Sequence, residues 1–344
     1  MVVASHYSVV LPHRSFLLET GWVGVDLFFV LSGFLISGLL FSEVKASGTI
    51  NVKRFWIRRG FKIYPPFYAL IGLTALVALV RHGKLPPTLF GEAVFLQNYL
   101  PSFWPHTWSL GVEEHFYLLL PLLLLFLVRL GNGKENPFRL IPIISIGLAV
   151  VCLYMRIVAF RHGAEWANIA WPTHLRMDAL FAGVTLGYYA HFDQQAFREA
   201  GKRWVLVVGL VFVSTLVLLP DVPRLTFAYV AFCFIVAWTI NQPESSNKVT
   251  RVLAWVGYYS YSIYLWHVGS MLVLERMPPR WFRFPSYVIL TVVFGVLMAE
   301  LIELPVLHVR DRYFPSRSTM RYPSTDLYPS PNCKPVKQVS ISAP

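Results

Sequence analysis

The chain has 344 residues, of which 56% are hydrophobic and only 14% charged, and its mean hydropathy is +0.53. Soluble globular proteins carry about 25% charged residues, so the composition argues against a water-soluble enzyme and against disordered, coiled-coil and collagen-like chains. It predicts a polytopic integral membrane protein. The three cysteines, Cys152, Cys233 and Cys333, show no disulfide framework and no metal-ligand spacing.

Apolar runs of about 17–21 residues recur along the chain, each long enough to cross a hydrocarbon core of about 30 Å. A shorter apolar run, residues 1–11, precedes them; it is too short to span and lacks the basic start of a signal peptide. We therefore expect an all-α bundle of about ten transmembrane helices, the first truncated to a remnant at 1–12. The nine full spans are expected near 22–42, 63–80, 109–129, 140–159, 174–190, 204–220, 224–240, 254–274 and 286–304.

The basic residues predict the orientation of this bundle. Twenty Lys and Arg side chains fall in every second loop and in the segment after residue 305, whereas eight fall in the alternate loops. The positive-inside rule places the larger group in the cytoplasm, with both termini on that side. This accounts for the net charge of +12 without nucleic acid. We expect a transmembrane domain over 1–314 and a disordered cytoplasmic tail over 315–344, which is rich in Pro and Ser.

Charged side chains inside apolar spans are informative, because each costs about 2.5–3.5 kcal/mol to insert. Arg176 and Asp178 are two residues apart, so they point to different faces and are expected to pair with other helices. Glu113 and Glu114 are adjacent and cannot share one helix face, so we expect only one to face the bundle interior. Asp26, at a helix start after Gly24, can cap or orient, and His267 fits a hydrogen-bonded interior position.

His6 is the candidate catalytic residue among these polar groups. It is the single imidazole of the first apolar run, and a neutral histidine can take a proton from a hydroxyl near neutral pH. A hydrogen-bonded core histidine with no catalytic role is the alternative.

A basic stripe leads into the second expected span. Arg54, Arg58 and Lys62 follow at four-residue spacing, with Arg59 beside them. The stripe fits either an anchor for lipid headgroups or a site for a polyphosphate ligand such as coenzyme A, since guanidinium groups pair phosphate oxygens bidentately.

Six ordered segments closely resemble the integral-membrane acyltransferase 3 family. The segments are GVDLFFVLSGFLI (24–36), FxxRRxxKIxP (55–65), TWSLGVEEHFY (107–117), RxDxLxxG (176–183), GxxSYSIYLWH (257–267) and ExP (303–305). The first segment includes Asp26 and Ser32, and the second includes Arg58, Arg59 and Lys62 of the basic stripe. The third begins at Thr107 and contains Glu113. His6 matches the family's first-helix histidine. The arginine that the family carries eleven residues earlier would precede Met1, Lys62 stands where the family more often has arginine, and Val268 stands where proline is frequent.

The resemblance implies transfer of an acyl group, usually acetyl, from cytoplasmic acyl-CoA to a hydroxyl of a glycan, a lipid-linked sugar or a small metabolite. It favours a bacterial inner membrane and requires no metal, because the thioester is already activated. The implied roles are catalysis by His6 and Glu113, and acyl-CoA binding by Arg58, Arg59 and Lys62. Asp26, Ser32, Arg176, Asp178 and His267 are expected to have structural or orienting roles.

Two other functions remain open at this stage. A transporter or flippase could use the same buried charges to pass a polar substrate, although the internal repeat typical of such folds is not visible. The second alternative is an inactive, truncated homologue, because the arginine of the family's first helix would precede Met1 and is not in this sequence.

Overall fold

The computed structural model describes residues 2–7, 21–131, 135–203, 207, 221–242, 247–274 and 280–315. Every regular element in the described part is a helix, in agreement with the all-α prediction. The elements are α1 (Val2–Tyr7), η1 (Gly21–Val23), α3 (Gly24–Ser47), α4 (Val52–His82), α5 (Leu89–Ala93), η2 (Pro105–Thr107), α6 (Trp108–Gly131), α7 (Ile141–Arg161), α8 (Trp166–Ala170), η3 (Thr173–Leu175), α9 (Met177–Phe192), α10 (Gln194–Arg203), α12 (Asp221–Asn241), α13 (Lys248–Leu274), α14 (Arg280–Met298), η4 (Ala299–Glu303) and α15 (Leu304–Tyr313).

Six helical stretches in the described residues are long and apolar enough to cross a membrane, so the predicted count of about ten is not confirmed. They are Gly21–Ser47, Val52–His82, Pro105–Gly131, Ile141–Arg161, Val222–Asn241 and Phe284–Tyr313. The expected span at 174–190 is the 16-residue α9, and the one at 254–274 lies in the 27-residue α13. The expected span at 204–220 lies outside the described residues except for residue 207. The expected tail over 315–344 lies outside them except for residue 315.

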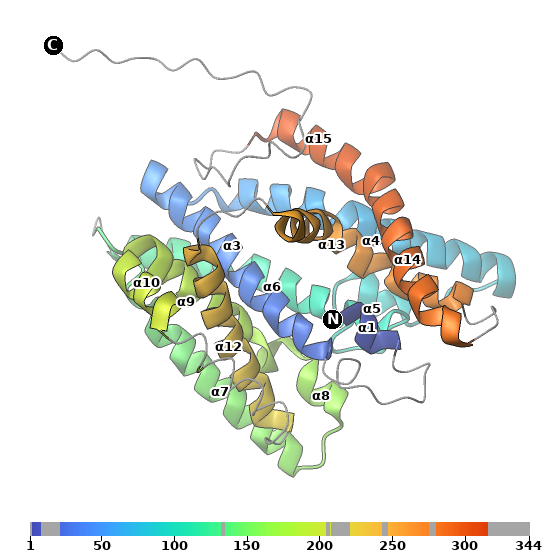
Figure 1. Cartoon of the computed structure of the whole chain (residues 1–344), viewed down its shortest axis with the longest axis horizontal. Coiled ribbons are helices and arrows are strands. Elements are labelled where there is room, and N and C mark those ends of the chain that lie inside the picture. The colour runs from blue at the N-terminus through green and yellow to red at the C-terminus, as the bar shows by residue number, and fades with distance from the viewer. Residues whose placement is uncertain are drawn as a thin grey trace.

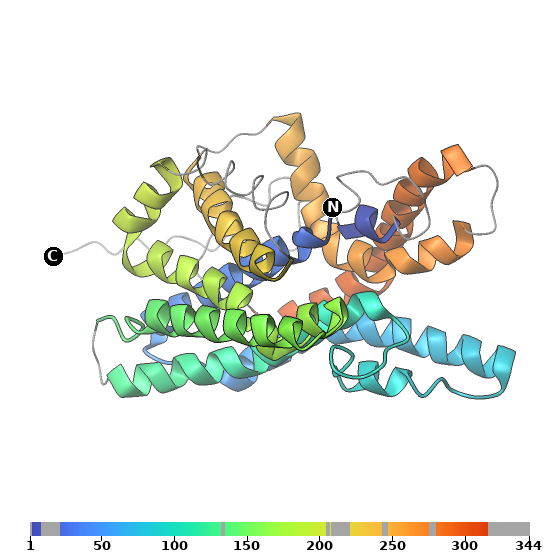
Figure 2. The ribbon, with the colours of Figure 1, turned by 90° about the horizontal axis from the view of Figure 1, so that it is seen from below.

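The helices form two groups that meet at α3 and α6 (Figure 1). One group contains α7, α9, α10 and α12, and the other contains α4, α13, α14 and α15 (Figures 1 and 2). The short helix α1 contacts α13 and α14 of the second group and η1 at the start of α3. Residues from the very beginning of the chain therefore meet residues near its end.

Glycines permit the close packing of α3 on α9. A Cβ atom at Gly33 would lie 2.0 Å from the carbonyl oxygen of Leu180, and one at Gly183 would lie 2.2 Å from that of Val30. The backbones of the two helices therefore touch directly, which is typical of small residues at membrane helix interfaces. This contact holds α9 in the interior beside α3, where α9 buries ten of its residues.

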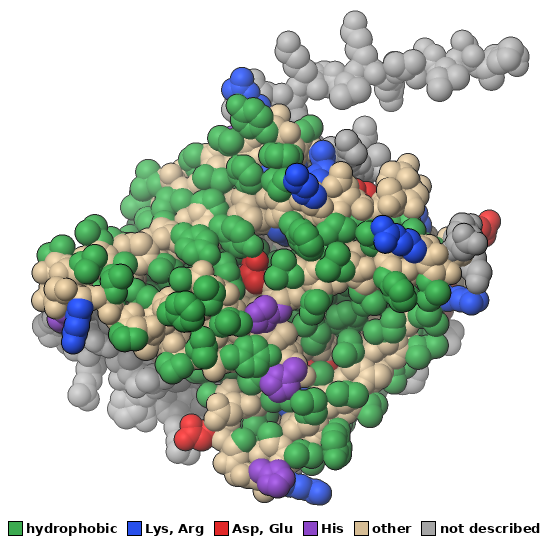
Figure 3. All heavy atoms as spheres, turned by 180° about the vertical axis from the view of Figure 1, so that it is seen from behind, with side chains coloured by type: hydrophobic (Ala, Val, Ile, Leu, Met, Phe, Trp, Pro, Cys, Tyr) green, Lys and Arg blue, Asp and Glu red, His purple; other side chains and the backbone are tan. Residues whose placement is uncertain are grey.

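The outer surface is apolar, as expected for a protein in a bilayer. On α7, residues such as Ile143, Ile146 and Val150 are exposed. Only 17% of the most apolar 18-residue stretch of this helix is buried inside the protein. Figure 3 shows a face dominated by hydrophobic side chains, with most Lys and Arg side chains toward its edge. A large exposed apolar area of this kind is stable next to hydrocarbon and unfavourable in water.

The last membrane-crossing stretch is longer than the sequence indicated. Instead of ending near residue 304, the helix passes through a wide π turn, Ala299–Glu303, and continues as α15 to Tyr313. Such π turns are frequent at functional sites. Here the turn places Glu303, which is 1% exposed, against α4 and α13.

Candidate functional site

Three histidines from distant segments meet inside the second helix group. His6 lies on α1, His106 in η2 and His267 on α13. The ring centroids of His6 and His267 are 4.9 Å apart and nearly parallel, and His106 packs edge-on against both, at 6.3 Å from His6 and 4.9 Å from His267. His106 is 5% exposed and His267 is fully buried. We call these three residues the histidine cluster.

Hydrogen bonds in the cluster define which nitrogens carry protons. Nδ1 of His267 bonds the backbone carbonyl of Tyr264, and a carbonyl can only accept, so this nitrogen donates its N–H. In the neutral ring Nε2 of His267 is then an acceptor, and Nδ1 of His6, 2.7 Å away, must donate to it. The chain of bonds leaves Nε2 of His6 unprotonated, which is the form that a general base requires.

His106 presents a second unprotonated nitrogen. Its Nε2 donates to the carbonyl of Leu265 at 3.2 Å, which leaves Nδ1 as an acceptor. This Nδ1 is buried and has no hydrogen-bond partner in the described part of the chain. A buried acceptor without a partner is costly, so a hydroxyl-bearing ligand or water at the cluster would satisfy it.

Tyr264 and Ser109 hold the cluster in place. The Tyr264 hydroxyl donates to the backbone carbonyl of His106 and lies 2.8 Å from Oγ of Ser109. Tyr264 also supplies the carbonyl that orients His267. One tyrosine therefore links η2, the start of α6 and α13 around the histidines.

Glu113 belongs to a separate polar group one turn further along α6. Its Oε1 accepts from the Tyr117 hydroxyl at 2.6 Å, and that hydroxyl is 2.8 Å from Oγ of Ser32. Glu113 is 3% exposed, and Glu114 accepts from the Tyr64 hydroxyl at 3.0 Å. Glu114 is 6% exposed, so both carboxylates are buried, and the prediction that only one of them faces the interior is wrong. No hydrogen bond or ion pair in the described residues joins Glu113 to His6; the imidazole's partner there is His267.

The basic stripe lies on the first turns of α4 and is covered by α15. Nη2 of Arg58 is 3.2 Å from Oδ1 of Asp311, and Arg58 also donates to the carbonyl of Phe314. Lys62 pairs with the buried carboxylate of Glu303. The Arg59 guanidinium lies 5.6 Å from the centroid of the Tyr117 ring. The stripe thus adjoins the Glu113 group.

Asp26, Arg176 and Asp178 form a buried charge network with Arg156. Arg176 pairs with Asp26 at 2.7 Å, and Arg156 pairs with Asp178 at 2.6 Å. Arg176 and Asp178 bond other helices and not each other, as their spacing predicted. All four side chains are at most 2% exposed, so the network has balanced charge and joins α3, α7 and α9. In the part of the chain that the structure describes, no hydrogen bond or ion pair links this network to the histidine cluster.

One side of α13 connects the basic stripe to the histidine cluster. Tyr261, Tyr264 and His267 recur every three residues and therefore lie near one face. The Tyr261 ring lies 5.7 Å from Nζ of Lys62, and its hydroxyl donates to the carbonyl of Ile63 at 2.8 Å. His267 reaches His6 at the other end. From Tyr261 to His267 the helix rises about 9 Å.

Sequence reasoning missed His106, Ser109 and Tyr264 as site residues. Ser109 and Tyr264 lie within resembling segments but are neutral, and His106 directly precedes one, so charge within an apolar span did not single them out. A Pro-His-Thr sequence at the start of a long apolar helix, followed by a polar segment, is the signal that could have found His106.

Glu92 organises the segment that leads into η2. Its buried side chain accepts the backbone N–H of Trp104, two residues before His106. Burial raises the pKa of this carboxyl, and the backbone hydrogen bonds that it accepts partly offset the increase.

In the described residues no group of three His, Cys, Asp or Glu side chains is arranged to hold a metal ion.

Comparison with known proteins relates most of the helical region to a family. A family model described as an acyltransferase domain matches residues 1–300. The peptidoglycan O-acetyltransferase OatA of Listeria monocytogenes is 27% identical over 322 residues, which cover 83% of this chain and 51% of that protein. The O-acetyltransferase OatA of Staphylococcus aureus is 26% identical over 329 residues, covering 84% of this chain and 53% of that protein. The chain spans about half the length of these curated relatives. No solved structure matches.

Proposed function

This chain belongs to the acyltransferase-domain family, and from that membership we propose that it is a membrane O-acyltransferase that moves an acyl group, acetyl in the first instance, from acyl-CoA to a hydroxyl. The acceptor is a glycan, a lipid-linked sugar or a small metabolite. The names of the two relatives, both O-acetyltransferases and one acting on peptidoglycan, support acetyl as the group and a glycan as the acceptor.

The single observation that carries the proposal is the hydrogen-bond chain from the Tyr264 carbonyl through His267 to His6. It holds the His6 imidazole in one tautomer, with Nε2 free of a proton. In catalysis this Nε2 takes the proton of the acceptor hydroxyl while the hydroxyl oxygen attacks the thioester carbonyl carbon. The C–S bond then breaks, and the CoA sulfur leaves with the proton that His6 carried. His267 acts through His6, as a positioning residue.

Acyl-CoA is proposed to approach from the end of the bundle that bears the basic stripe. Arg58, Arg59 and Lys62 supply the positive charge that its phosphates need, and the positive-inside rule places this end in the cytoplasm. The present partners of Arg58 and Lys62 are the carboxylates of Asp311 and Glu303. Phosphates of the donor would compete with them, most easily at Asp311, whose side chain is 52% exposed.

On α6, Glu113 lies between Ser109, which bonds Tyr264 beside the cluster, and Tyr117, whose ring packs against Arg59 of the stripe. We propose that Glu113, with Tyr117 and Ser32, lines the route by which the acyl end of the donor reaches His6. The face of α13 from Tyr261 to His267 forms the other side of this route.

The test is transfer of label from acetyl-CoA to hydroxyl acceptors in membranes that contain the protein. His6→Ala is expected to lower the rate by about 10²–10⁴-fold, the usual contribution of a general base. His267→Ala is expected to lower kcat with little change in the KM for acetyl-CoA and to alter the pH profile. His162→Ala is the matched control, because His162 is an exposed histidine at the end of α7 and is expected to leave the rate unchanged.

A second arm separates base catalysis from acyl relay. If His6 carried the acyl group itself, single-turnover mixtures of protein and acetyl-CoA without acceptor would accumulate an acyl-histidine, which mass spectrometry of the 1–20 peptide would detect. Base catalysis predicts none. Equal transfer by wild type and His6→Ala would overturn the assignment of the cluster. No transfer from a folded wild-type protein with several acceptors would favour the transport or inactive-homologue functions.

A further inference from the structure

Two arginines from different helices bind one carboxylate where α15 covers the basic stripe. Nε and Nη2 of Arg310 on α15 donate to the two oxygens of Asp311, each at 2.9 Å. Nη2 of Arg58 on α4 lies 3.2 Å from Oδ1 of the same carboxylate. A guanidinium that donates to both oxygens of an acid has the geometry in which arginine also binds phosphate. We call Arg58 and Arg310 the arginine pair.

The arginine pair is better shielded from solvent than the carboxylate that it holds. The side chains of Arg58 and Arg310 are 22% and 18% exposed, whereas that of Asp311 is 52% exposed. An ion pair with so exposed a partner contributes little to stability. Another anion can therefore replace Asp311 while both guanidiniums stay in place.

The helix that supplies half of this site can adjust to such an exchange. None of the ten residues of α15, all of them described, is buried, and the helix lies at the edge of the second helix group (Figure 1). Its last turn is tied to α4 because Arg58 donates to the carbonyl of Phe314 and Arg54 to that of Pro315. Segments with few buried contacts move at low free-energy cost, so α15 can shift without disturbing the packed interior.

The charge at this place favours an anion with more than one negative charge. Among the described residues, Asp311 is the one carboxylate that pairs with Arg54, Arg58 or Arg310. The guanidiniums of Arg54 and Arg310 are both close enough to Arg58 to repel it. Three positive charges thus share one negative charge. A phosphate monoester carries about 1.5–2 negative charges near pH 7, so it fits this place better than the carboxylate does.

The distance of the arginine pair from the histidine cluster indicates which phosphate of the donor it fits. Arg58 lies one turn of α4, about 6 Å, farther from the cluster than Lys62, which contacts Tyr261 at the near end of the α13 face. Acyl-CoA carries a diphosphate nearer its thioester and a monoester phosphate on the ribose at its far end. With the thioester at His6, the diphosphate lies nearer Lys62 and the ribose phosphate at the arginine pair.

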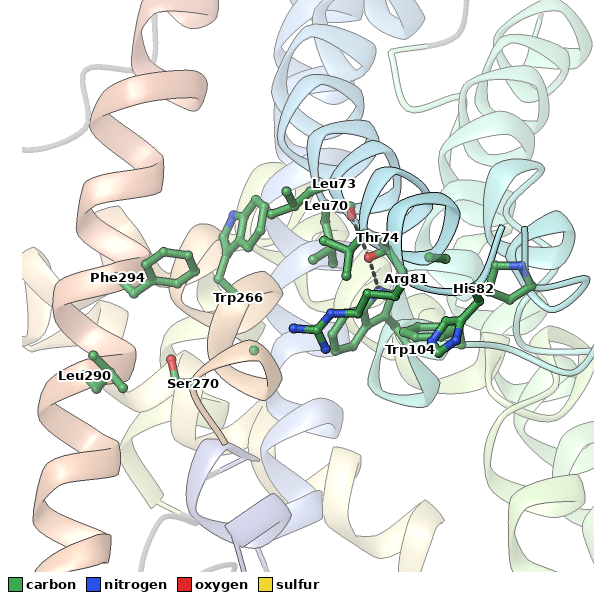
Figure 4. Close-up of a pocket in the computed structure, with 15 residues that line it drawn as sticks. Leu70, Leu73, Thr74, Arg81, His82, Trp104, Trp266, Ser270, Leu290 and Phe294 are labelled. Atoms are coloured by element: carbon green, nitrogen blue, oxygen red, sulfur yellow. Dashed lines mark hydrogen bonds between the residues drawn. The ribbon is translucent and has the colours of Figure 1, made fainter. Parts of the chain in front are cut away.

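The cavity at the other end of α4 offers no comparable site in its described lining. It has a volume of about 450 Å³ and begins at Leu70, beyond Lys62 and beside Trp266 (Figure 4). The lining is mostly hydrocarbon, and Arg81 is the one guanidinium among the described residues that form it. Two guanidiniums match the charge of a phosphate monoester better than one, which favours the stripe end for the phosphates of the donor.

We propose that Arg58 and Arg310 together bind the ribose 3′-phosphate of acyl-CoA, and that Asp311 occupies this phosphate site until the donor replaces it. The inference rests on the proposed function, because it takes acyl-CoA as the donor. It adds α15 to the donor site and makes Arg310 a substrate-binding residue.

The test is equilibrium binding of CoA and of 3′-dephospho-CoA, which lacks only this phosphate, to the full chain in phosphatidylcholine nanodiscs. Wild type is expected to bind CoA about tenfold more tightly, through charge-assisted hydrogen bonds to the phosphate. Arg310→Gln is expected to lose this preference and to bind 3′-dephospho-CoA as wild type does, which also shows that the variant is folded.

Arg312→Gln is the matched control, because it removes the same charge from the same helix. The Arg312 guanidinium lies 6.0 Å from the centroid of the Tyr313 ring, and in the described residues it does not pair with Asp311. This variant is expected to keep the preference for CoA. Asp311→Asn is expected to strengthen binding of CoA more than that of 3′-dephospho-CoA.

The outcomes separate this inference from the proposed function. Equal affinity of wild type for the two compounds, or an unchanged preference in Arg310→Gln, overturns the inference even if acetyl transfer is observed. A preference that Arg310→Gln removes supports it even if no acceptor is acetylated. If neither compound binds, the donor assignment and this inference both fail.

A lipid headgroup is the other source of a phosphate monoester at this end of the bundle. The same binding measurement in mixed nanodiscs of phosphatidylcholine and phosphatidic acid distinguishes the two sources, because the headgroup of phosphatidic acid is a phosphate monoester. The preference for CoA is expected to persist there. Its loss would assign the arginine pair to a lipid headgroup and overturn the inference.

Discussion

Replacing Gly33 by alanine tests the claim that α3 and α9 are held together by direct backbone contact. The new methyl carbon would lie 2.0 Å from the Leu180 carbonyl oxygen and 3.1 Å from Cα of Gly183. Carbon and oxygen atoms in contact need more than 3 Å, so the helices must separate by about 1 Å along this line. Neither neighbour is a flexible side-chain end, so the strain cannot be relieved by a rotamer change.

The size of the effect follows from two opposing contributions. Overpacking a tight interior contact costs about 1–3 kcal/mol, and two rigid backbones place Gly33→Ala at the upper end. Alanine itself favours a helix over glycine by about 0.5–1 kcal/mol. Gly72, in the middle of α4, is the matched control because a Cβ there meets no atom within 4 Å, so Gly72→Ala should gain only this helix term. Because both variants gain the helix term, it cancels, and the two should differ by the overpacking cost alone, about 2–3 kcal/mol.

The assay is thermal unfolding in nanodiscs followed by tryptophan fluorescence, for which the chain has 11 tryptophans. We expect Gly33→Ala to melt several degrees below wild type and Gly72→Ala at or slightly above it. If Gly33→Ala unfolds at the same temperature as Gly72→Ala, the two helices are not in backbone contact, and the account of how α9 is held in the interior is refuted.

Three further predictions concern charges. Arg176→Leu leaves Asp26 buried and unpaired and should destabilise the fold by about 3–5 kcal/mol, with most of the loss recovered on adding Asp26→Leu, as melting temperatures will report. Burial raises the pKa of Glu92 in the folded state, so the protonated carboxyl favours folding. This contribution to stability is present below the pKa of the unfolded chain, about 4.3, and is lost as the pH rises through the pKa of the folded state. The melting temperature of wild type minus that of Glu92→Gln should therefore fall between pH 4 and neutrality, and a constant difference would contradict this. Arg58→Gln should raise the KM for acyl-CoA several-fold. Asp311→Asn removes the carboxylate that pairs with Arg58 and should lower this KM up to about fivefold. If initial-rate measurements show that the KM changes in the same direction in both variants, Asp311 and acyl-CoA do not compete for Arg58.

The helical membrane class and the family could both be predicted without the structure. Low charge and repeated apolar runs need only be counted, because the bilayer imposes helix length and apolarity on each span separately. The resemblance, inferred from six short segments, was confirmed by the family match over residues 1–300. The number of spans was less accessible. The helix ending at Tyr313 extends nine residues past the predicted end, because the π turn lets the helix pass Pro305 without a break.

Which polar residues lie together could be seen only in the folded molecule. His6 and His267 are 261 positions apart, and their hydrogen bond depends on how α1 packs against α13. Spacing along one helix predicts neighbours on that helix, and it contains no information about a contact between two helices. For the same reason the partners of Asp26 and Lys62 could not be assigned from the chain. The polar residues were visible in the sequence because each is costly in a membrane; their grouping required the fold that makes that cost tolerable.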